Sequence, residues 1–195
     1  MIYYPAFLDL KEKQALLFGA GEVAFRKAKV LIQAGAKVSV ISRDFSSDFI
    51  RLAKQKKIKL TRGSKIPKQL KNISLIIAAT SDSTFNKSIY KRCKKSGILV
   101  NVVDDPDHST FIVPSVIRRG NLQVAISTGG ASPYLAKLLR QKFEAELSSK
   151  YADLVRFFKK ERIRIKAGIS NSNQRREYFY RLVKSKLNQL NQKRK

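Results

Sequence analysis

The chain has 195 residues, of which 43% are hydrophobic, so it can form one full domain with a real core and a smaller appendage. Its 41 Lys and Arg against 14 Asp and Glu give a formal net charge of +27, which favours a polyanionic partner or a solvated lysine-rich surface. The single cysteine, Cys93, excludes an intrachain disulfide and a cysteine-rich zinc site.

The N-terminal stretch, MIYYPAFLDLKEKQ, lacks the basic and apolar regions of a signal peptide. No later apolar run approaches the roughly 18 residues that a membrane span requires. We therefore expect a cytoplasmic protein with no membrane partner.

The first half of the chain alternates short apolar runs with amphipathic segments of helical spacing. Strands that are apolar on both faces and alternate with helices are typical of a parallel sheet covered on two sides. Residues 1–113 are therefore predicted to form a Rossmann-like, doubly wound α/β domain. The predicted strands are 14–21 (running into a glycine turn), 37–42, 58–63, 74–80 and 98–103, and the predicted helices are 22–34, 44–57 and 81–97.

The pattern changes after Pro114. VIRRGNLQVAIST places a Gly-Asn turn between two apolar runs, which predicts antiparallel strands. A helix should follow, with Ser132 as its N-cap and Pro133 at its first position. Its apolar stripe consists of Leu135, Leu138, Leu139 and Phe143.

The C-terminal segment, residues 150–195, is strongly basic. It holds 15 Lys and Arg against 3 acids, a net charge of +12, and it fits two helices at about 150–166 and 174–191. We expect it to form a small helical domain.

The turn after the first predicted strand, Gly19 to Ala24, has the form G-x-G-x-x-A. In a dinucleotide-binding unit Gly19 permits the tight turn, and Gly21 lets the pyrophosphate approach the backbone at the positive end of the helix. The small Ala24 lets the helix pack closely on the strand. The intact strand–turn–helix context favours this interpretation over a tight turn that binds nothing.

The end of the second predicted strand, Ser42-Arg43-Asp44, should contact the adenosine ribose of such a dinucleotide. Asp44 can accept hydrogen bonds from the ribose hydroxyl groups, as in an NAD site. Arg43 can instead accept the 2′-phosphate of NADP, so the residues themselves leave both cofactors open.

Two adjacent carboxylates follow the fifth predicted strand. A parallel strand delivers its carboxyl end into the crevice where ligands meet, so Asp104 is placed as a candidate base. A turn-capping role is the alternative for Asp104, and Asp105 and Asp107 are interpreted as turn formers around Pro106. His108, the only histidine, is interpreted as a loop residue near the mouth of the site rather than as a catalytic or metal-binding group.

Several of these segments together resemble a known family. YPAFLDLKEKQALLFGAGEVAFRKAKVLIQAGAKVSVIS resembles the opening of siroheme synthases of the precorrin-2 dehydrogenase/sirohydrochlorin ferrochelatase type. The resemblance continues in order through LIIAATSDSTFN, NVVDDP and FIVPSVIRRGNLQVAISTGGASPYLAKLLR. It covers about residues 4 to 147, whereas only helical character is shared beyond that point.

The resemblance implies an enzyme that passes a hydride from precorrin-2 to NAD, giving sirohydrochlorin, and it slightly favours NAD over NADP. In some members the same site also inserts ferrous iron, which would then be a substrate. It further implies a homodimer, with dimer contacts from residues 114–149 and with the tail, 150–195, closing over the tetrapyrrole. The eight carboxylates of precorrin-2 give the basic charge a candidate cause, since a basic cleft would concentrate such a ligand.

The same resemblance assigns roles to individual residues. Asp104 corresponds to the catalytic aspartate, and no resident metal site is expected. Thr128 and Ser132 lie in the ISTGGxSP stretch and are candidate substrate-binding residues, although some relatives have serine at position 128. The candidate cofactor-binding residues are Gly19, Gly21, Glu22 and Val23 at the pyrophosphate, Arg43 and Asp44 at the ribose, and Thr80 and Asn101 near the nicotinamide half.

Two other classes of protein remain as alternatives. A nucleic-acid-binding protein on a Rossmann core would use the basic tail, but the chain has no helix-turn-helix or RNA-binding motif, which disfavours a nucleic-acid partner. A non-catalytic dinucleotide sensor would keep the glycine turn without the oxidation chemistry.

Overall fold

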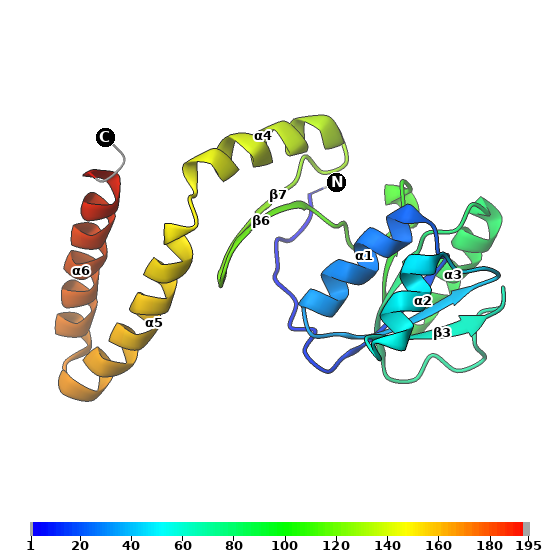
Figure 1. Cartoon of the computed structure of the whole chain (residues 1–195), viewed down its shortest axis with the longest axis horizontal. Coiled ribbons are helices and arrows are strands. Elements are labelled where there is room, and N and C mark those ends of the chain that lie inside the picture. Colours follow the sequence, from blue (N-terminus) through cyan, green and yellow to red (C-terminus); the bar gives the residue numbers. More distant parts are fainter. Residues whose placement is uncertain (1, 193–195) are drawn as a thin grey trace. The chain divides into compact units, whose positions relative to one another are not determined.

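The computed structural model describes residues 2–192 and divides the chain into two compact units, Met1–Val113 and Pro114–Lys195. In the first unit five parallel strands form one sheet in the order β3-β2-β1-β4-β5, which confirms the predicted Rossmann-like architecture (Figure 1). The strands are β1 (Gln14–Phe18), β2 (Lys37–Ser42), β3 (Ile58–Arg62), β4 (Ile73–Ala78) and β5 (Leu99–Val102), and the helices are α1 (Glu22–Gln33), α2 (Ser47–Lys54) and α3 (Ser83–Ser96).

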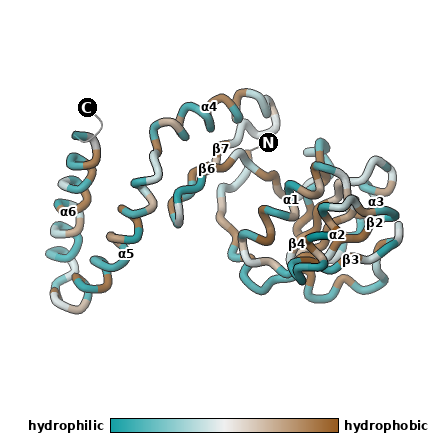
Figure 2. The backbone as a smooth tube through the Cα atoms, in the orientation of Figure 1, coloured by the Kyte–Doolittle hydropathy of each residue, from teal (hydrophilic) through white to brown (hydrophobic). Residues whose placement is uncertain are grey.

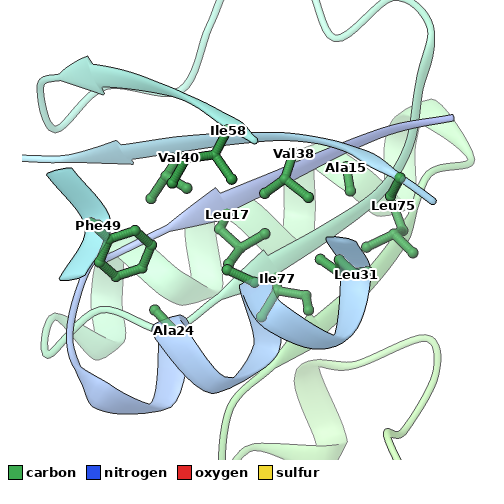
Figure 3. Close-up of a cluster of buried hydrophobic side chains, with 12 residues drawn as sticks. Ala15, Leu17, Ala24, Leu31, Val38, Val40, Phe49, Ile58, Leu75 and Ile77 are labelled. Carbon is green, nitrogen blue, oxygen red and sulfur yellow. The ribbon is translucent and has the colours of Figure 1, made fainter. Parts of the chain in front are cut away.

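The central strand β1 is buried on both faces because its side chains point alternately to two separate hydrophobic clusters. Leu17 belongs to the cluster covered by α1 and α2, where Ala24 and Phe49 pack (Figure 3). Phe18 belongs to the opposite cluster, covered by α3. This two-sided burial explains why the strands are continuously apolar rather than alternating.

Helix α2 is shorter than the helix predicted for residues 44–57. It ends at Lys54, and Lys56 adopts a left-handed φ of 56°, with its N–H donating to the Ala53 carbonyl at 2.8 Å. A left-handed residue cannot continue a right-handed helix, so the chain turns here into β3.

The open edge of β5 is covered by the segment that follows it. The Thr110 and Ser109 hydroxyls accept from the backbone N–H groups of Val100 at 2.8 Å and Val102 at 2.9 Å. A short 3₁₀ turn, η1 (Pro106–His108), lies between the strand and this returning segment. The edge is thereby protected from pairing with another chain, and the residues directly after β5 are held in a closed loop.

The second unit begins with the antiparallel pair β6 (Ser115–Arg119) and β7 (Leu122–Ile126), which confirms the predicted antiparallel strands. Helix α4 (Pro133–Glu146) starts as predicted, with the Ser132 hydroxyl accepting from the Leu135 N–H. The Arg119 guanidinium fixes the far end of α4 by donating to the Leu147 carbonyl at 2.6 Å and to the Glu144 carbonyl at 3.1 Å.

Two long helices complete this unit, α5 (Lys150–Gly168) and α6 (Ser172–Gln192), which pack antiparallel to each other (Figure 1). Their contact is aromatic, with the ring of Phe158 lying 5.6 Å from those of Phe157 and Phe179. Both helices are largely hydrophilic, in contrast to the apolar strands of the first unit (Figure 2). No helix among residues 2–192 is long and apolar enough to cross a membrane.

Candidate active site

A cleft of about 1040 Å³ lies at the carboxyl ends of the five parallel strands. This is the edge of a doubly wound sheet where ligands bind, next to the position where the strand order reverses. Each strand contributes the residues that directly follow it, namely 19–24 after β1, 43–46 after β2, 63–64 after β3, 79–82 after β4 and 103–104 after β5.

Gly19 forms the tight turn after β1. Its φ is +97°, and a Cβ at this position would lie 2.3 Å from the carbonyl oxygen of Ala79. Only glycine therefore permits the turn to pass this close to the end of β4.

Gly21 differs from Gly19, since its φ of −77° is open to any residue and a Cβ there would meet nothing within 4 Å. It is the N-cap of α1 and provides no side-chain hydrogen bond to the first-turn N–H groups. Open space in front of a helix N-terminus with uncapped N–H groups fits the pyrophosphate of a dinucleotide. Glu22 and Val23 line the cleft beside it.

The ends of β2 and β3 meet at another part of the cleft. Arg43 and Asp44 are both exposed there, so the structure keeps a carboxylate and a guanidinium at the predicted ribose site. Gly63 and Ser64 join them from β3, and the Gly63 N–H donates to the Ser42 carbonyl at 3.0 Å. Sequence reasoning missed these two residues because only the pairing of β2 with β3 brings them to the site.

Thr80 lines the cleft, but its hydroxyl is already hydrogen-bonded within the protein. It donates to the Asn86 side-chain oxygen at 2.7 Å, and the Asn86 amide returns a bond to the Thr80 carbonyl at 3.0 Å. Asn86 is buried in α3, so this pair fixes the passage from β4 into the helix. Thr80 is thus held rigidly at the rim.

Asn101 is placed differently from the other predicted cofactor residues. It is buried in β5, and its amide donates to the Phe111 carbonyl at 3.2 Å. It is not one of the residues that line the cleft. In the structure, the Asn101 amide therefore holds the segment around Phe111 against the edge strand β5.

Asp104 is exposed at the rim of the cleft, two residues after the end of β5. Its φ is 60°, in the left-handed region that non-glycine residues seldom occupy. The turn is closed because the Asp105 N–H donates to the Val102 carbonyl at 3.2 Å, while the Val103 N–H donates to Ala78 at 2.9 Å. Aspartate is one of the non-glycine residues that adopt this conformation most often, and the two backbone hydrogen bonds hold it at the rim of the cleft.

The neighbouring carboxylate, Asp105, has a different role. It accepts from the Nδ1 of His108 at 2.8 Å and from the His108 backbone N–H at 3.2 Å, and this hydrogen bonding lowers its pKa. The His108 ring in turn packs edge-on against Tyr90 of α3 at 5.3 Å. Asp105 and His108 therefore close the loop after Asp104, which agrees with their interpretation as turn and loop residues.

Lys27 is a charged residue of α1 on which the charge of Asp104 acts, and sequence reasoning counted it only as part of a helix face. It is half-buried on α1, and burial lowers the pKa of its ammonium, while the Asp104 carboxylate raises it. Helical spacing alone could not reveal this, since Asp104 lies far away in the sequence.

The charge of the cleft is opposite to that of the chain as a whole. Its charged lining residues are one cation, Arg43, and four acids, Glu22, Asp44, Asp82 and Asp104. The basic excess of the chain therefore lies outside this cleft. Across residues 2–192, no group of three or more His, Cys, Asp or Glu side chains could hold a metal ion.

The two predicted substrate residues lie in the second unit, in the loop before α4. The Thr128 hydroxyl donates to the Ser132 carbonyl at 3.0 Å and accepts from the Ser132 N–H at 3.0 Å. Gly129 and Gly130 between them have φ values of 64° and 93°. The loop is therefore tightly closed by its own hydroxyl groups.

Fold and cleft together define an NAD(P)-binding protein of the Rossmann type, and comparison with known families agrees. Residues 6–115 match a family described as "Putative NAD(P)-binding". Residues 119–146 match the family described as the sirohaem biosynthesis protein central domain. The chain belongs to the siroheme synthase N-terminal family.

Individual relatives support this membership. The siroheme synthase of Buchnera aphidicola subsp. Acyrthosiphon pisum is 41% identical over 185 residues, covering 95% of this chain and 39% of that protein. Siroheme synthase 3 of Aeromonas hydrophila is 40% identical over 183 residues, with 94% and 39% covered. The chain thus spans about two-fifths of the length of these curated relatives. The solved structure of SirC, a precorrin-2 dehydrogenase, superposes with a TM-score of 0.78 at 26% identity, covering 92% of this chain and 89% of that one.

Proposed function

We propose that this chain oxidises precorrin-2 to sirohydrochlorin with NAD as the hydride acceptor. The observation that carries the proposal is the position of Asp104, an exposed carboxylate at the rim of the same cleft that contains the Gly19–Gly21 turn. A dinucleotide turn and a base in one cleft are what a hydride transfer coupled to proton loss requires. The likeness to siroheme synthases and to SirC, a precorrin-2 dehydrogenase, supports the choice of substrate.

NAD would supply the hydride acceptor when bound. The uncapped N–H groups at the start of α1 would hold its pyrophosphate, and Glu22 and Val23 would line that position. Asp44 would accept hydrogen bonds from the ribose hydroxyl groups, and this is why we propose NAD as the cofactor. Arg43 beside it keeps NADP as the alternative cofactor.

Asp104 would act as the proton acceptor. Removal of a hydride from a saturated precorrin carbon must be accompanied by loss of a proton from the substrate, and an exposed carboxylate at the cleft rim can receive it. Asp104 lies in a short turn that the Asp105 N–H closes by donating to the Val102 carbonyl.

We assign tetrapyrrole binding to the second unit. The exposed cations of α5 and α6 are suited to the substrate's carboxylates, and Thr128 and Ser132 are proposed to contact it. Residues 114–149 are proposed as the dimerisation region of a cytoplasmic homodimer, because Leu135, Leu138 and Phe143 of α4 expose apolar surface. Residues 150–195 would form the basic helical domain.

The deciding experiment incubates the purified chain with precorrin-2 and NAD and follows the absorbance of reduced nicotinamide. The expected result is stoichiometric NADH and sirohydrochlorin. A protein that binds NAD but gives no NADH would instead be a dinucleotide sensor. Binding of nucleic acid at physiological salt, with no dinucleotide binding, would favour the nucleic-acid alternative.

Insertion of ferrous iron into sirohydrochlorin is a second candidate activity, since Asp104 could also receive the pyrrole protons that the metal displaces. Its test is separate from that of the dehydrogenase. Sirohydrochlorin and ferrous iron without NAD should give siroheme faster than the protein-free reaction, and an equal rate would remove this candidate.

A further inference from the structure

Asp104 depends on its neighbours for its position. None of the hydrogen bonds or ion pairs within residues 2–192 involves its carboxylate. The residue lies at the third position of a four-residue turn, which the Asp105 N–H closes by donating to the Val102 carbonyl at 3.2 Å. The place of the Asp104 carboxylate is therefore set by this turn and not by a partner of its own.

Asp105, the last residue of the turn, is held by its side chain as well as by its backbone. Its carbonyl accepts from the Ser109 hydroxyl at 2.8 Å, and that hydroxyl also accepts from the Val102 N–H at 2.9 Å. Its carboxylate accepts from the backbone N–H of His108 at 3.2 Å and from the ring Nδ1 at 2.8 Å. The amide, the carbonyl and the carboxylate of the residue next to Asp104 are thus all fixed.

His108 connects this turn to helix α3. Its ring packs edge-on against Tyr90, with ring centroids 5.3 Å apart and an interplanar angle of 88°. Tyr90 packs against the hydrophobic cluster that contains Val102, and the Lys94 ammonium lies 5.8 Å from the centroid of its ring. In the neutral imidazole, the bond to Asp105 places the proton on Nδ1, so one tautomer and one ring orientation are favoured.

The Asp105–His108 pair serves the turn more than it serves the sheet. Its side chains are 29% and 31% exposed, and both residues lie beyond the end of β5. The open edge of β5 is covered by other groups, the Thr110 and Ser109 hydroxyls. The principal effect of the pair is therefore on the segment that carries Asp104.

We propose that Asp105 and His108 are positioning residues for Asp104, which fix the turn against Tyr90 of α3 so that the carboxylate is presented to the cleft in one orientation. This inference rests on the proposed role of Asp104 as proton acceptor. Neither residue is among those that line the cleft, so both act through the turn and not by touching NAD or the substrate. A misplacement of a reacting group by about 1 Å can cost about 100-fold in rate.

The test uses three variants of His108 that separate its two contacts. His108→Asn keeps an N–H at the place of Nδ1 but loses the ring, His108→Phe keeps a ring beside Tyr90 but loses the donor, and His108→Ala loses both. The hydrogen bond reaches the turn directly, so kcat should fall about 10- to 100-fold in His108→Ala, about tenfold in His108→Phe and about threefold or less in His108→Asn. The KM for precorrin-2 and the dissociation constant of NAD should stay nearly unchanged in all three variants.

Asp107→Asn is the matched control, because Asp107 is exposed in the same 3₁₀ turn. It should keep the parental kcat. A parental kcat in His108→Ala would overturn the inference. A rise in KM as large as the fall in kcat would also overturn it, since that result would indicate general damage to the cleft.

A second measurement does not depend on activity. Amide hydrogen exchange, followed by NMR in the full chain without ligands, reports how firmly the turn is closed. In His108→Ala the Asp105 amide should exchange about tenfold faster or more, whereas the Val103 amide, which donates to Ala78 at 2.9 Å, should keep its parental rate.

An unchanged rate at the Asp105 amide, or an equal acceleration at both amides, would contradict a specific hold on the turn. If the parent itself does not oxidise precorrin-2, the proposed function fails, and the exchange rates still decide whether His108 holds the turn.

Discussion

Gly19 and Ala79 approach each other so closely that a Cβ on Gly19 would lie 2.3 Å from the Ala79 carbonyl oxygen. The two residues follow β1 and β4, the neighbouring strands at the centre of the sheet, and both line the cleft. The turn of the dinucleotide site is therefore also a packing contact of the core, and a change at this position should act on stability as well as on binding.

Replacement of Gly19 by alanine should strongly destabilise the first unit. The new methyl group meets a backbone carbonyl, and φ of +97° is unfavourable for any residue with a Cβ, so we expect a loss of about 3 kcal/mol or more in the free energy of unfolding. Gly97→Ala is the control, because Gly97 also has a positive φ of +67° but no atom within 4 Å of a Cβ. It should lose only about 1–2 kcal/mol in urea unfolding. Equal losses in the two variants would show that the close approach is unimportant.

Gly21→Asp should weaken NAD binding without lowering the stability of the fold. The position has an ordinary φ and open space, and aspartate is a good N-cap, so the unfolding free energy should stay equal or rise slightly. The new carboxylate would stand where the pyrophosphate is expected, and we predict about 100-fold weaker NAD binding by calorimetry. Parental affinity in this variant would contradict the assignment of the turn.

Asp104→Asn should abolish most turnover while leaving the fold intact. Loss of a general base costs about 100-fold or more in kcat, and asparagine tolerates the left-handed backbone. Asp104→Ala should in addition lose about 1 kcal/mol of stability, because alanine does not tolerate it. NAD should bind both variants as it binds the parent.

The control for Asp104 should be Asp107→Asn rather than a change at Asp105. Asp107 is exposed within η1, whereas Asp105 holds His108 and so supports the turn itself. Asp107→Asn should keep parental turnover. If it lost activity while Asp104→Asn kept it, the catalytic residue would have to be placed elsewhere in the loop.

Asp105 should contribute a pH-dependent part of the stability. Hydrogen bonding by His108 lowers the pKa of this carboxyl from its ordinary value of 3.8. A group with a depressed pKa in the folded state stabilises the protein fully above the unfolded value and loses this contribution as pH falls through the folded value. Asp105→Asn should therefore be less stable than the parent in urea unfolding at pH 7, and the difference should shrink as the pH falls below 3.8. A difference that stays constant over this range would contradict the role of the ionised group.

The exposed cations of α5 should matter for the tetrapyrrole and not for NAD. Exposed ion pairs contribute about 0.2–1 kcal/mol each, so replacing Lys159, Lys160 and Arg162 together by glutamine should weaken precorrin-2 binding roughly tenfold. The effect should fade at high salt. The same number of changes on the first unit, at the exposed Lys54, Lys57 and Lys91, should leave that affinity unchanged. Equal weakening by both sets would indicate only a general effect of net charge.

Much of the fold could be predicted from local patterns. The strands of the sheet, the glycine turn at 19–24, the hairpin around Gly120 and the start of α4 at Ser132 each depend on residues a few positions apart. Apolar periodicity and capping preferences act over that range, so the sequence alone expresses them. The early end of α2 escaped prediction, because nothing in the local pattern requires Lys56 to adopt a left-handed conformation.

The composition of the cleft was decided only by the tertiary structure. Strand order β3-β2-β1-β4-β5 brings Ser64 to the expected ribose site and places Asp104 where its charge acts on Lys27 of α1. It also leaves Asn101 buried against Phe111, although it precedes Asp104 by only three residues. The charge and burial of the cleft residues depend on groups that are distant in the chain. The packing of helices on the sheet brings these groups together, and the spacing of neighbouring residues in the sequence does not specify that packing.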